Sequence, residues 1–246
     1  MRELIKAEFF KLAIELNYKL LLLFSLVIGL IFGISSIQLG TTATGSVWYA
    51  IIGTGILYNA VLVSIFAADF IGSEFKDRTF SASVSCGILR EKIVYAKSVV
   101  FFVAILSLIL TYNLVCVFIL TIQNGFGMEF NIQTITFLLY KTIYCILCNI
   151  TMGSLIFLIA FMVKNKIQII GLGIVGIYML SQWNITARSP IILKILQFTF
   201  VYQLDAVISG RRAKQVPLWI VAVSSIIETA ILLFAAVIVF QKSDLK

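Results

Sequence analysis

Two phenylalanines stand among charged residues from Glu74 to Phe80, where the sequence reads EFKDRTF, and further charges follow up to Lys97. The stretches on both sides are long and almost continuously apolar. A solvated loop needs no phenylalanines, whereas a protein interface favours aromatic and arginine anchors surrounded by charges. We therefore interpret residues 72–97 as a docking surface. A charged loop whose phenylalanines dip into lipid is the alternative that this composition leaves open.

The residue types that carry most enzyme chemistry are missing or poorly placed. Histidine is absent, which removes serine–histidine triads and imidazole metal sites. Cys145 and Cys148 form a C-x-x-C, but the apolar run around them disfavours the thiolate that metal or redox chemistry needs. No glycine directly precedes a lysine, so the chain has no P-loop. We predict a non-catalytic chain without a cofactor or metal of its own.

Glu228 lies near the middle of the last apolar run. A carboxylate at that depth of a membrane is costly and must face protein or water. Two roles fit: Glu228 binds the cationic part of a peptide, on a path shared with Tyr112 and Asn113, or it forms a hydrogen bond with a neighbouring span, for example at one of those two residues. The residue types leave both roles open.

Of the 246 residues, 61% are hydrophobic and 12% are charged, which excludes a water-soluble globule. One membrane crossing takes about 20 mostly apolar residues. The sequence predicts an all-α integral membrane protein with a single transmembrane domain, 1–246. Its six predicted spans are 20–37, 47–71, 98–122, 141–163, 167–182 and 217–240, of which the fifth is short. The basic residues are spread over short loops, which argues against nucleic-acid binding.

Two shorter elements are expected to position these spans. Apolar and charged residues recur at helical spacing in residues 1–19, which predicts an amphipathic helix on the inner membrane surface. A cytosolic extension of the first span is the alternative. Lys76 to Ser85 lacks glycine and proline, which predicts one short helix that ends before Gly87.

Glycines at short spacing mark two of the predicted spans, where they permit close approach of another helix. Gly29 and Gly33 form a G-x-x-x-G in the first span, and Gly171, Gly173 and Gly176 thin part of the fifth. An interface between two membrane subunits is one interpretation. Chance occurrence, which is common for glycine in membrane spans, is the other.

The distribution of lysine and arginine predicts that both termini and residues 72–97 face the cytosol, because positive residues beside spans stay on that side. Residues 183–216 are the exception, with five basic residues on the outer side in this topology. Residues 191–208 as a seventh span would reverse the placement of the C-terminus. The charges within that run favour an amphipathic or re-entrant outer segment instead.

The motifs of residues 74–97 resemble those of the membrane (permease) subunits of type-2 ABC exporters. In that family the segment after the second span reads E-F-x-x-x-T, followed by small residues, G-I-x-R and a downstream A-K. The matching residues are Glu74, Phe75, Thr79, Gly87, Ile88, Arg90, Ala96 and Lys97. By its size and its lack of a large outer domain, the chain is most similar to small bacterial permeases that export or clear antimicrobial and amphipathic peptides.

The resemblance implies a division of labour within a complex in the bacterial cytoplasmic membrane. Two copies of a cytosolic ATPase subunit, which bind ATP and Mg²⁺, would contact a coupling helix between spans two and three. The implied coupling residues are Glu74, Phe75, Lys76, Asp77, Arg78, Thr79, Phe80 and Arg90. A second membrane subunit, identical or related, would complete the peptide path, and residues 183–216 would form an outer re-entrant gate.

Two other functions remain as alternatives to ATP-driven peptide export. One is a membrane immunity protein that sequesters an antimicrobial peptide without transport. The other is a secondary transporter driven by an ion gradient, which would be expected to show several charges inside the membrane. Glu228 alone meets that expectation.

Overall fold

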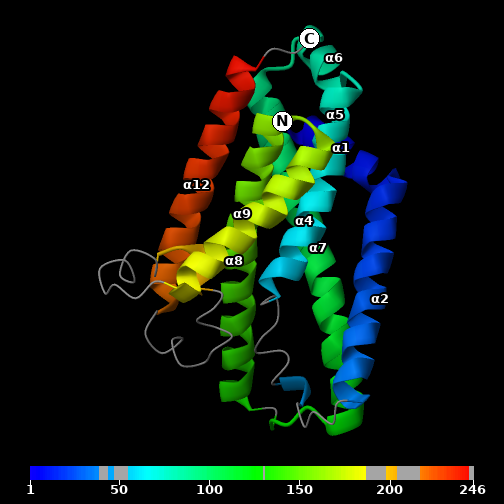
Figure 1. Ribbon diagram of the computed structural model, residues 1–246, viewed down its shortest axis with the longest axis vertical. Helices are drawn as coiled ribbons and strands as arrows, with labels where there is room; N and C mark the ends of the chain where they lie inside the picture. Colours follow the sequence, from blue (N-terminus) through cyan, green and yellow to red (C-terminus); the bar gives the residue numbers. More distant parts are fainter. Residues whose placement is uncertain (39–43, 47–54, 130, 187–197, 204–216, 244–246) are drawn as a thin grey trace.

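The described part of the chain is helical throughout and contains no strand (Figure 1). The computed structural model describes residues 1–38, 44–46, 55–129, 131–186, 198–203 and 217–243. The elements in chain order are α1 (Arg2–Ile14), α2 (Leu16–Gln38), α4 (Ile56–Phe70), α5 (Gly72–Lys76), α6 (Thr79–Ser85), α7 (Arg90–Asn124), α8 (Ile132–Val163), α9 (Lys166–Thr186) and α12 (Leu218–Lys242).

Five helical stretches in this part of the chain are long and apolar enough to cross a membrane, so the protein is a multi-span helical membrane protein. They are Leu16–Ser36, Leu57–Lys76, Arg90–Asn124, Ile132–Val163 and Trp219–Lys242. The fifth predicted span, 167–182, falls on α9, whose apolar part Lys166–Gln182 is shorter than the other five. Residues 47–54 of the second predicted span lie outside the described residues, as does most of 183–216.

The N-terminal helix is shorter than the predicted 1–19. α1 ends at Ile14, Glu15 adopts an extended conformation, and α2 starts at Leu16. Residues 16–19 belong to the spanning helix α2, where two of them contact α4. The side-chain amide of Asn17 donates to Asp69 at 2.8 Å, and the ring of Tyr18 packs 5.8 Å from that of Phe66.

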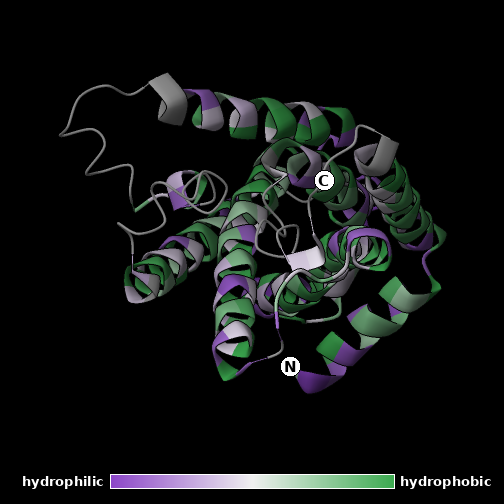
Figure 2. Cartoon of the chain, turned by 90° about the horizontal axis from the view of Figure 1, so that it is seen from below, coloured by the Kyte–Doolittle hydropathy of each residue, from purple (hydrophilic) through white to green (hydrophobic). Residues whose placement is uncertain are grey.

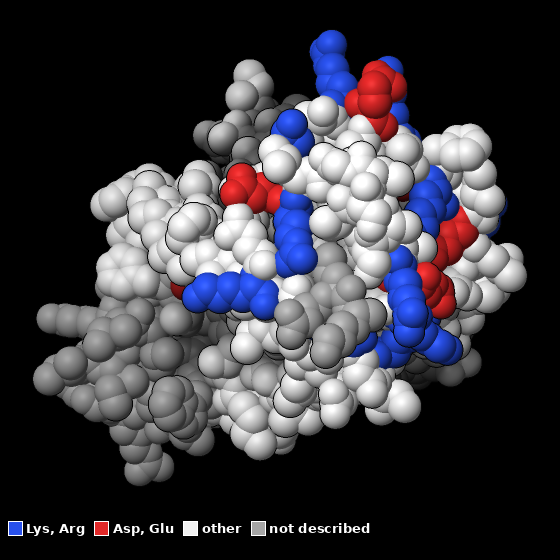
Figure 3. Space-filling model, turned by 90° about the horizontal axis from the view of Figure 1, so that it is seen from above, with Lys and Arg blue, Asp and Glu red and all other residues white. Residues whose placement is uncertain are grey.

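The long helices run up and down in turn, so α1, α5, α6 and the described end of α12 all lie at one end of the bundle (Figure 1). Hydrophobic residues cover much of the length of the helices (Figure 2). Basic and acidic side chains gather at the end that carries α1, α5 and α6, which we call the charged end (Figure 3). Lys141, the tenth of the 32 residues of α8, is an exception among the described lysines and arginines, because it lies 22 residues before the end of that helix.

α4 lies at the centre of the bundle and packs on α2, α7, α8 and α9. Within Leu57–Lys76, about 67% of the most apolar part is buried by the rest of the chain. The corresponding share is 17% for α2 and 28% for α12. α2 packs mainly on α7, and α12 mainly on α8. The interior therefore belongs to α4, α7 and α8, while α2 and α12 expose apolar outer faces.

The two glycines of the G-x-x-x-G bring α2 close to α7 within this chain. A Cβ atom added at Gly29 would lie 2.9 Å from the carbonyl oxygen of Tyr112 and 3.0 Å from the Cβ of Val115. One added at Gly33 would meet the side chain of Ile119. Gly29 and Gly33 therefore allow α2 and α7 of the same chain to pack closely. A subunit interface at these glycines stays a prediction.

We expect Gly29→Leu to push α2 away from α7, because the added side chain meets the α7 backbone. The cost should be about 1–3 kcal/mol of stability, as for other overpacked sites. Thermal unfolding of the purified chain, followed by tryptophan fluorescence, measures it. Gly171→Leu is the matched control, since nothing lies within 4 Å of a Cβ at Gly171. Equal melting temperatures for the two variants would contradict this packing.

Candidate functional site

The helix predicted over Lys76 to Ser85 starts three residues later than expected, because Lys76 is the last residue of α5 and a turn at Asp77 and Arg78 separates it from α6. α5 ends at Lys76, Arg78 adopts a left-handed conformation (φ 57°), and α6 begins at Thr79. In one continuous helix, Phe75 and Phe80 would point about 140° apart. The left-handed residue turns the chain so that both rings face the bundle, where Phe80 is buried and Phe75 half-buried.

The predicted end of this segment at Gly87 is confirmed. Gly87 has a φ of 82°, its N–H donates to Val84 at 3.0 Å, and the N–H of Ile88 donates to Ser83 at 3.3 Å. This pair of bonds is a Schellman motif, which satisfies the last carbonyls of α6 and favours glycine. The chain then enters α7 at Arg90.

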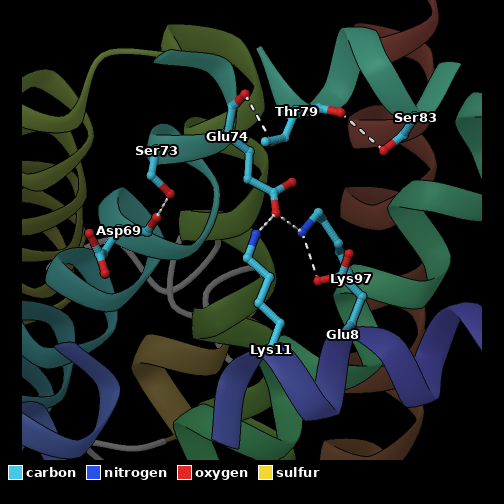
Figure 4. A network of polar contacts seen from close by, with 8 residues as sticks. All are labelled: Glu8, Lys11, Asp69, Ser73, Glu74, Thr79, Ser83 and Lys97. Carbon is cyan, nitrogen blue, oxygen red and sulfur yellow. Dashed lines mark hydrogen bonds and ion pairs between the residues drawn. The ribbon is translucent and has the colours of Figure 1, made fainter. Parts of the chain in front are cut away.

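A buried cluster of ion pairs fastens α5 to α1 and α7 (Figure 4). The ammonium of Lys97 on α7, whose side chain is 1% exposed, lies 2.8 Å from Glu74 on α5 and 2.9 Å from Glu8 on α1. Lys11 on α1 pairs with the same oxygen of Glu74. The Lys97 ammonium also lies 4.6 Å from the centre of the Phe70 ring. Opposite charges and a ring face therefore compensate a lysine that is withdrawn from water.

The local electrostatics keep Lys11 charged. Burial lowers the pKa of its ammonium, but the hydrogen bond to Glu74 and the nearby carboxylates of Glu8 and Glu15 outweigh burial and raise the pKa above its ordinary value. Burial, followed by the neighbouring carboxylate of Asp69, raises the pKa of Glu15. Cationic Lys11 thus stays available to Glu74 throughout the neutral range.

A continuous set of phenylalanine rings lies beneath α5 and α6. Phe75 and Phe80 lie 4.7 Å apart, centre to centre, and Phe80 lies 5.1 Å from Phe240 of α12. Phe161 of α8 lies within 6 Å of all three of these rings. Further contacts lead into the core through Phe157, Phe101, Phe66 and Phe70. Each such pair contributes about 0.5–1.5 kcal/mol beyond the burial of its area.

Arg90 ties the start of α7 to the end of α12. Its Nη1 lies 2.9 Å from the carbonyl oxygen of Phe240, 2.7 Å from that of Gln241 and 3.0 Å from that of Ser243. A cation at this position satisfies carbonyls that the helix end leaves unpaired and interacts favourably with the helix dipole. Gln241 also donates to Glu91 at 2.7 Å. The predicted coupling residue Arg90 therefore has internal partners.

The predicted coupling residues divide into two groups. Glu74, Phe80 and Arg90 hold the segment to the bundle, as does the inner face of Phe75. Lys76, Asp77, Arg78 and Thr79 are exposed at the tip between α5 and α6, which we call the α5–α6 tip. The hydroxyl of Thr79 donates to the backbone carbonyl of Glu74 at 3.3 Å, and it thereby stiffens the turn. Contact of the tip with an ATPase stays a prediction.

Sequence reasoning did not assign Glu8, Lys11 and Lys97 to the site. Lys97 was visible as part of the A-K motif, and Glu8 and Lys11 stand one helical turn apart on the polar side of α1. A second junction was also missed: Asp69 at the end of α4 accepts from Lys166 of α9 at 2.8 Å. Charges on separate helices can be paired only once the packing is known.

The cavities found beside Glu228 among the described residues are not lined by the other two residues of the predicted substrate path. Tyr112 on α7 packs against Tyr58 of α4 at 4.6 Å and Phe32 of α2 at 6.1 Å, between ring centres. Asn113 is buried, and its amide donates to Ile109 of its own helix at 2.8 Å. Glu228 on α12 accepts a backbone hydrogen bond from Phe200 and lines two cavities that Tyr112 and Asn113 do not line. The predicted common path stays untested.

The glycines of α9 face in different directions. A Cβ at Gly173 would collide with the side chain of Ser64 on α4. Gly171 and Gly176 have nothing within 4 Å of such an atom. Gly173 therefore serves packing within this chain, and Gly171 and Gly176 leave part of α9 open.

No metal site is formed by the residues described, since no group of three or more aspartate, glutamate or cysteine side chains converges among them. Cys145 and Cys148 are both buried in α8 as free thiols. The thiol of Cys148 lies 3.8 Å from the side-chain oxygen of Gln203, and the amide of Asn149 lies 3.2 Å from the sulfur of Cys145. Both sulfurs thus take part in helix packing.

No family model matches the chain, and neither the curated proteins nor the solved structures contain a match to it.

We expect Lys97→Met to destabilise the protein by about 3–5 kcal/mol, because it leaves the buried carboxylate of Glu74 and the partly buried carboxylate of Glu8 without the cation that they share. The methionine preserves most of the apolar stem, so the loss reports on charge. Lys6→Met is the matched control, since its ion pair with Glu3 joins side chains that are 73% and 85% exposed. Chemical or thermal unfolding measures both. A Lys97→Met chain as stable as Lys6→Met would show that the cluster contributes little.

Proposed function

We propose that this chain is the non-catalytic permease subunit of an ATP-driven exporter in a bacterial cytoplasmic membrane, and that its cargo is a hydrophobic or amphipathic peptide. A separate ATPase subunit, in two copies, binds ATP and Mg²⁺ and docks on the α5–α6 tip. Both termini and this tip face the cytosol. The proposal joins the resemblance of residues 74–97 to type-2 ABC permeases with the geometry of the charged end.

The main support for the proposal is that the α5–α6 segment has a buried inner side and an exposed, charged outer side. Its inner side is fixed by Glu74 and by the rings of Phe75 and Phe80, while Lys76, Asp77 and Arg78 project into solvent. A rigid base with an exposed, charged tip suits a segment that receives a force from another protein. The clustering of basic side chains at this end supports a cytosolic orientation (Figure 3).

The contacts of the segment suggest how a movement of the tip would spread. The ion pairs of Glu74 connect it to α1 and α7, and the phenylalanine rings connect it to α8 and α12. Packed helices respond to displacement as rigid bodies. Closure of an ATPase dimer around ATP would therefore tilt several spanning helices together, and ATP would favour the arrangement that it contacts better.

The described residues 198–203 support a re-entrant segment on the opposite side of the membrane. Phe200 to Gln203 are buried, and Gln203 donates to Ser224 of α12 at 2.6 Å. The hydroxyl of Tyr144 on α8 donates to the carbonyl of Gln203 at 3.0 Å. Ser224 lies about 9 Å along α12 from its start. In our proposal this segment closes the outer side of the path.

A second membrane subunit completes the path in this proposal. The apolar outer faces of α2 and α12 and the open face of α9 at Gly171 and Gly176 are available to a second copy, to a related permease or to lipid. The centre of the described bundle is filled, since about 67% of the apolar stretch in Leu57–Lys76 is buried by its neighbours. Cargo would therefore move between subunits.

We expect Arg78→Glu to abolish copurification of the ATPase with the tagged chain, because it reverses a charge at the exposed tip and leaves the buried anchors intact. The measurement is purification from the native cells, followed by detection of a bound chain that carries a P-loop and hydrolyses ATP. Lys6→Glu is the matched control, since it reverses an exposed charge at the same end but on α1. Undiminished ATPase recovery with Arg78→Glu would refute docking at the tip.

Measurements on the same purified complex distinguish peptide export from the two alternative functions. ATP turnover that rises on addition of an amphipathic cationic peptide supports export. Peptide binding that persists unchanged after removal of the ATPase, without stimulated turnover, supports sequestration. Peptide movement that follows an imposed ion gradient in vesicles without ATP supports a secondary transporter.

A further inference from the structure

Glu228 lies at the wall of a half-open apolar cavity, whose lining residues Leu180 and Ile231 are exposed at the surface of the bundle. It is ten residues beyond Leu218, so it sits about 15 Å along α12 and close to the middle of a bilayer. The cavity has a volume of about 280 Å³. Its lining comes from α8, α9, α12 and the 198–203 segment, and includes Leu155, Leu180, Phe200, Val201 and Ile231.

A second cavity, of about 350 Å³, lies against the same carboxylate. It is lined by Phe198, Trp219, Ile220, Val223, Ser224 and Ile227. The hydroxyl of Ser224 is already engaged with Gln203 at 2.6 Å and with the carbonyl of Val221 at 3.1 Å. Glu228 therefore supplies the carboxyl group that lines both cavities, whose other lining residues are apolar apart from Thr199 and Ser224.

The carboxylate of Glu228 is only partly satisfied. The backbone N–H of Phe200 donates to it, whereas Oε2 is buried and has no hydrogen-bond partner among the described residues. None of the ion pairs found in the described residues includes Glu228. A buried carboxylate oxygen without a donor is costly, and at membrane depth such a group marks a functional site.

The geometry points to a binding site for a primary ammonium group carried on an apolar chain, with the ammonium on Oε2 of Glu228 and the methylenes in the first cavity. The ligand is the lysine side chain of an amphipathic peptide or a lipophilic amine, which present the same chemistry. As a cargo site it rests on the proposed function; as an ammonium site it does not require the ATPase.

Other ligand classes fit this site less well. A guanidinium binds a carboxylate best through both oxygens, and the Phe200 amide already occupies part of the group. Hard metal ions need several oxygen ligands, whereas the linings are apolar apart from Glu228, Thr199 and Ser224. A neutral apolar ligand would leave Oε2 unpaired.

The test uses the full chain in phosphatidylcholine nanodiscs at neutral pH, with decylammonium as the probe and decanol as its uncharged counterpart. Binding is followed by tryptophan fluorescence, because Trp219 lines the second cavity. Empty nanodiscs and the Trp219→Phe chain correct for partition into lipid and for the other tryptophans. We expect saturable binding of decylammonium and a weaker, non-saturable response to decanol.

Glu228→Gln should weaken decylammonium binding at least tenfold, since the amide removes the charge but keeps the shape, and it should leave the response to decanol unchanged. Glu129→Gln, which removes an exposed carboxylate outside both cavities, should bind like the unaltered chain. Binding of decylammonium to Glu228→Gln within threefold of the unaltered chain would overturn the proposal. Equal saturable binding of decanol to the unaltered chain would overturn it as well.

A second variant keeps the test decisive if Glu228→Gln does not fold. Leu155→Phe retains the carboxylate, adds no tryptophan to the fluorescence signal and fills part of the first cavity with a larger side chain, so decylammonium affinity should again fall at least tenfold. Unchanged affinity would contradict the cavity as the site of the methylenes. Loss of ATPase copurification leaves these measurements unaffected, so the ammonium site and the proposed function fail separately.

A peptide arm distinguishes the two sources of the ammonium. The probe is an amphipathic helical peptide with a single lysine, compared with the same peptide carrying norleucine at that position. Lysine-dependent binding that is lost in Glu228→Gln identifies a peptide side chain as a ligand. Binding of decylammonium but of neither peptide supports the site with a small lipophilic amine as its ligand.

Discussion

A single buried lysine fixes the geometry of the charged end. The ammonium of Lys97 is almost fully withdrawn from water and holds carboxylates from two other helices, Glu74 on α5 and Glu8 on α1. Such an arrangement tolerates little displacement, because moving any one member leaves an uncompensated charge in an apolar setting. The positions of α1, α5 and α7 are therefore interdependent, and the exposed tip between α5 and α6 has a rigid base.

Aromatic packing extends this rigidity into the membrane. The rings of Phe75 and Phe80 pack on Phe161 and Phe240, and the contacts continue through Phe157 and Phe101 to the buried face of α4. Close-packed interiors transmit displacement and do not absorb it. Polar anchoring at one side and ring packing at the other thus make the α5–α6 segment part of the bundle, although its outer surface is charged and solvated.

Glu228 differs from Lys97 in that its carboxyl group is only partly satisfied by the described residues. Lys97 has its partners within the described chain, whereas one oxygen of Glu228 has none there. The two groups illustrate how a charge away from water is accommodated: by a complete set of internal partners where structure is its role, or by an external one where binding is. The cavities on both sides of Glu228 are consistent with the second case, which is the basis of the ammonium site proposed above.

Much of the architecture was predictable because the hydrocarbon core of a membrane demands apolar helices of a fixed length. The all-helical fold, the long spans and the helix end at Gly87 follow from hydropathy and from the backbone freedom of glycine. Side-chain partners were harder to predict. The sequence placed Phe75 and Arg90 at a partner surface, and the structure gives both of them contacts within the chain.

The amino-acid sequence by itself determined that the chain enters the membrane, roughly where it crosses, and which short segment carries the charges between two crossings. Only the tertiary structure decided that Arg78 breaks this segment into two helices, that Lys97 joins Glu74 to Glu8, and that Glu228 faces cavities away from Tyr112. Hydropathy and helix signals act between residues close in sequence. Ion pairs and cavities depend on which helix faces meet, and that is set by the packing of the whole bundle.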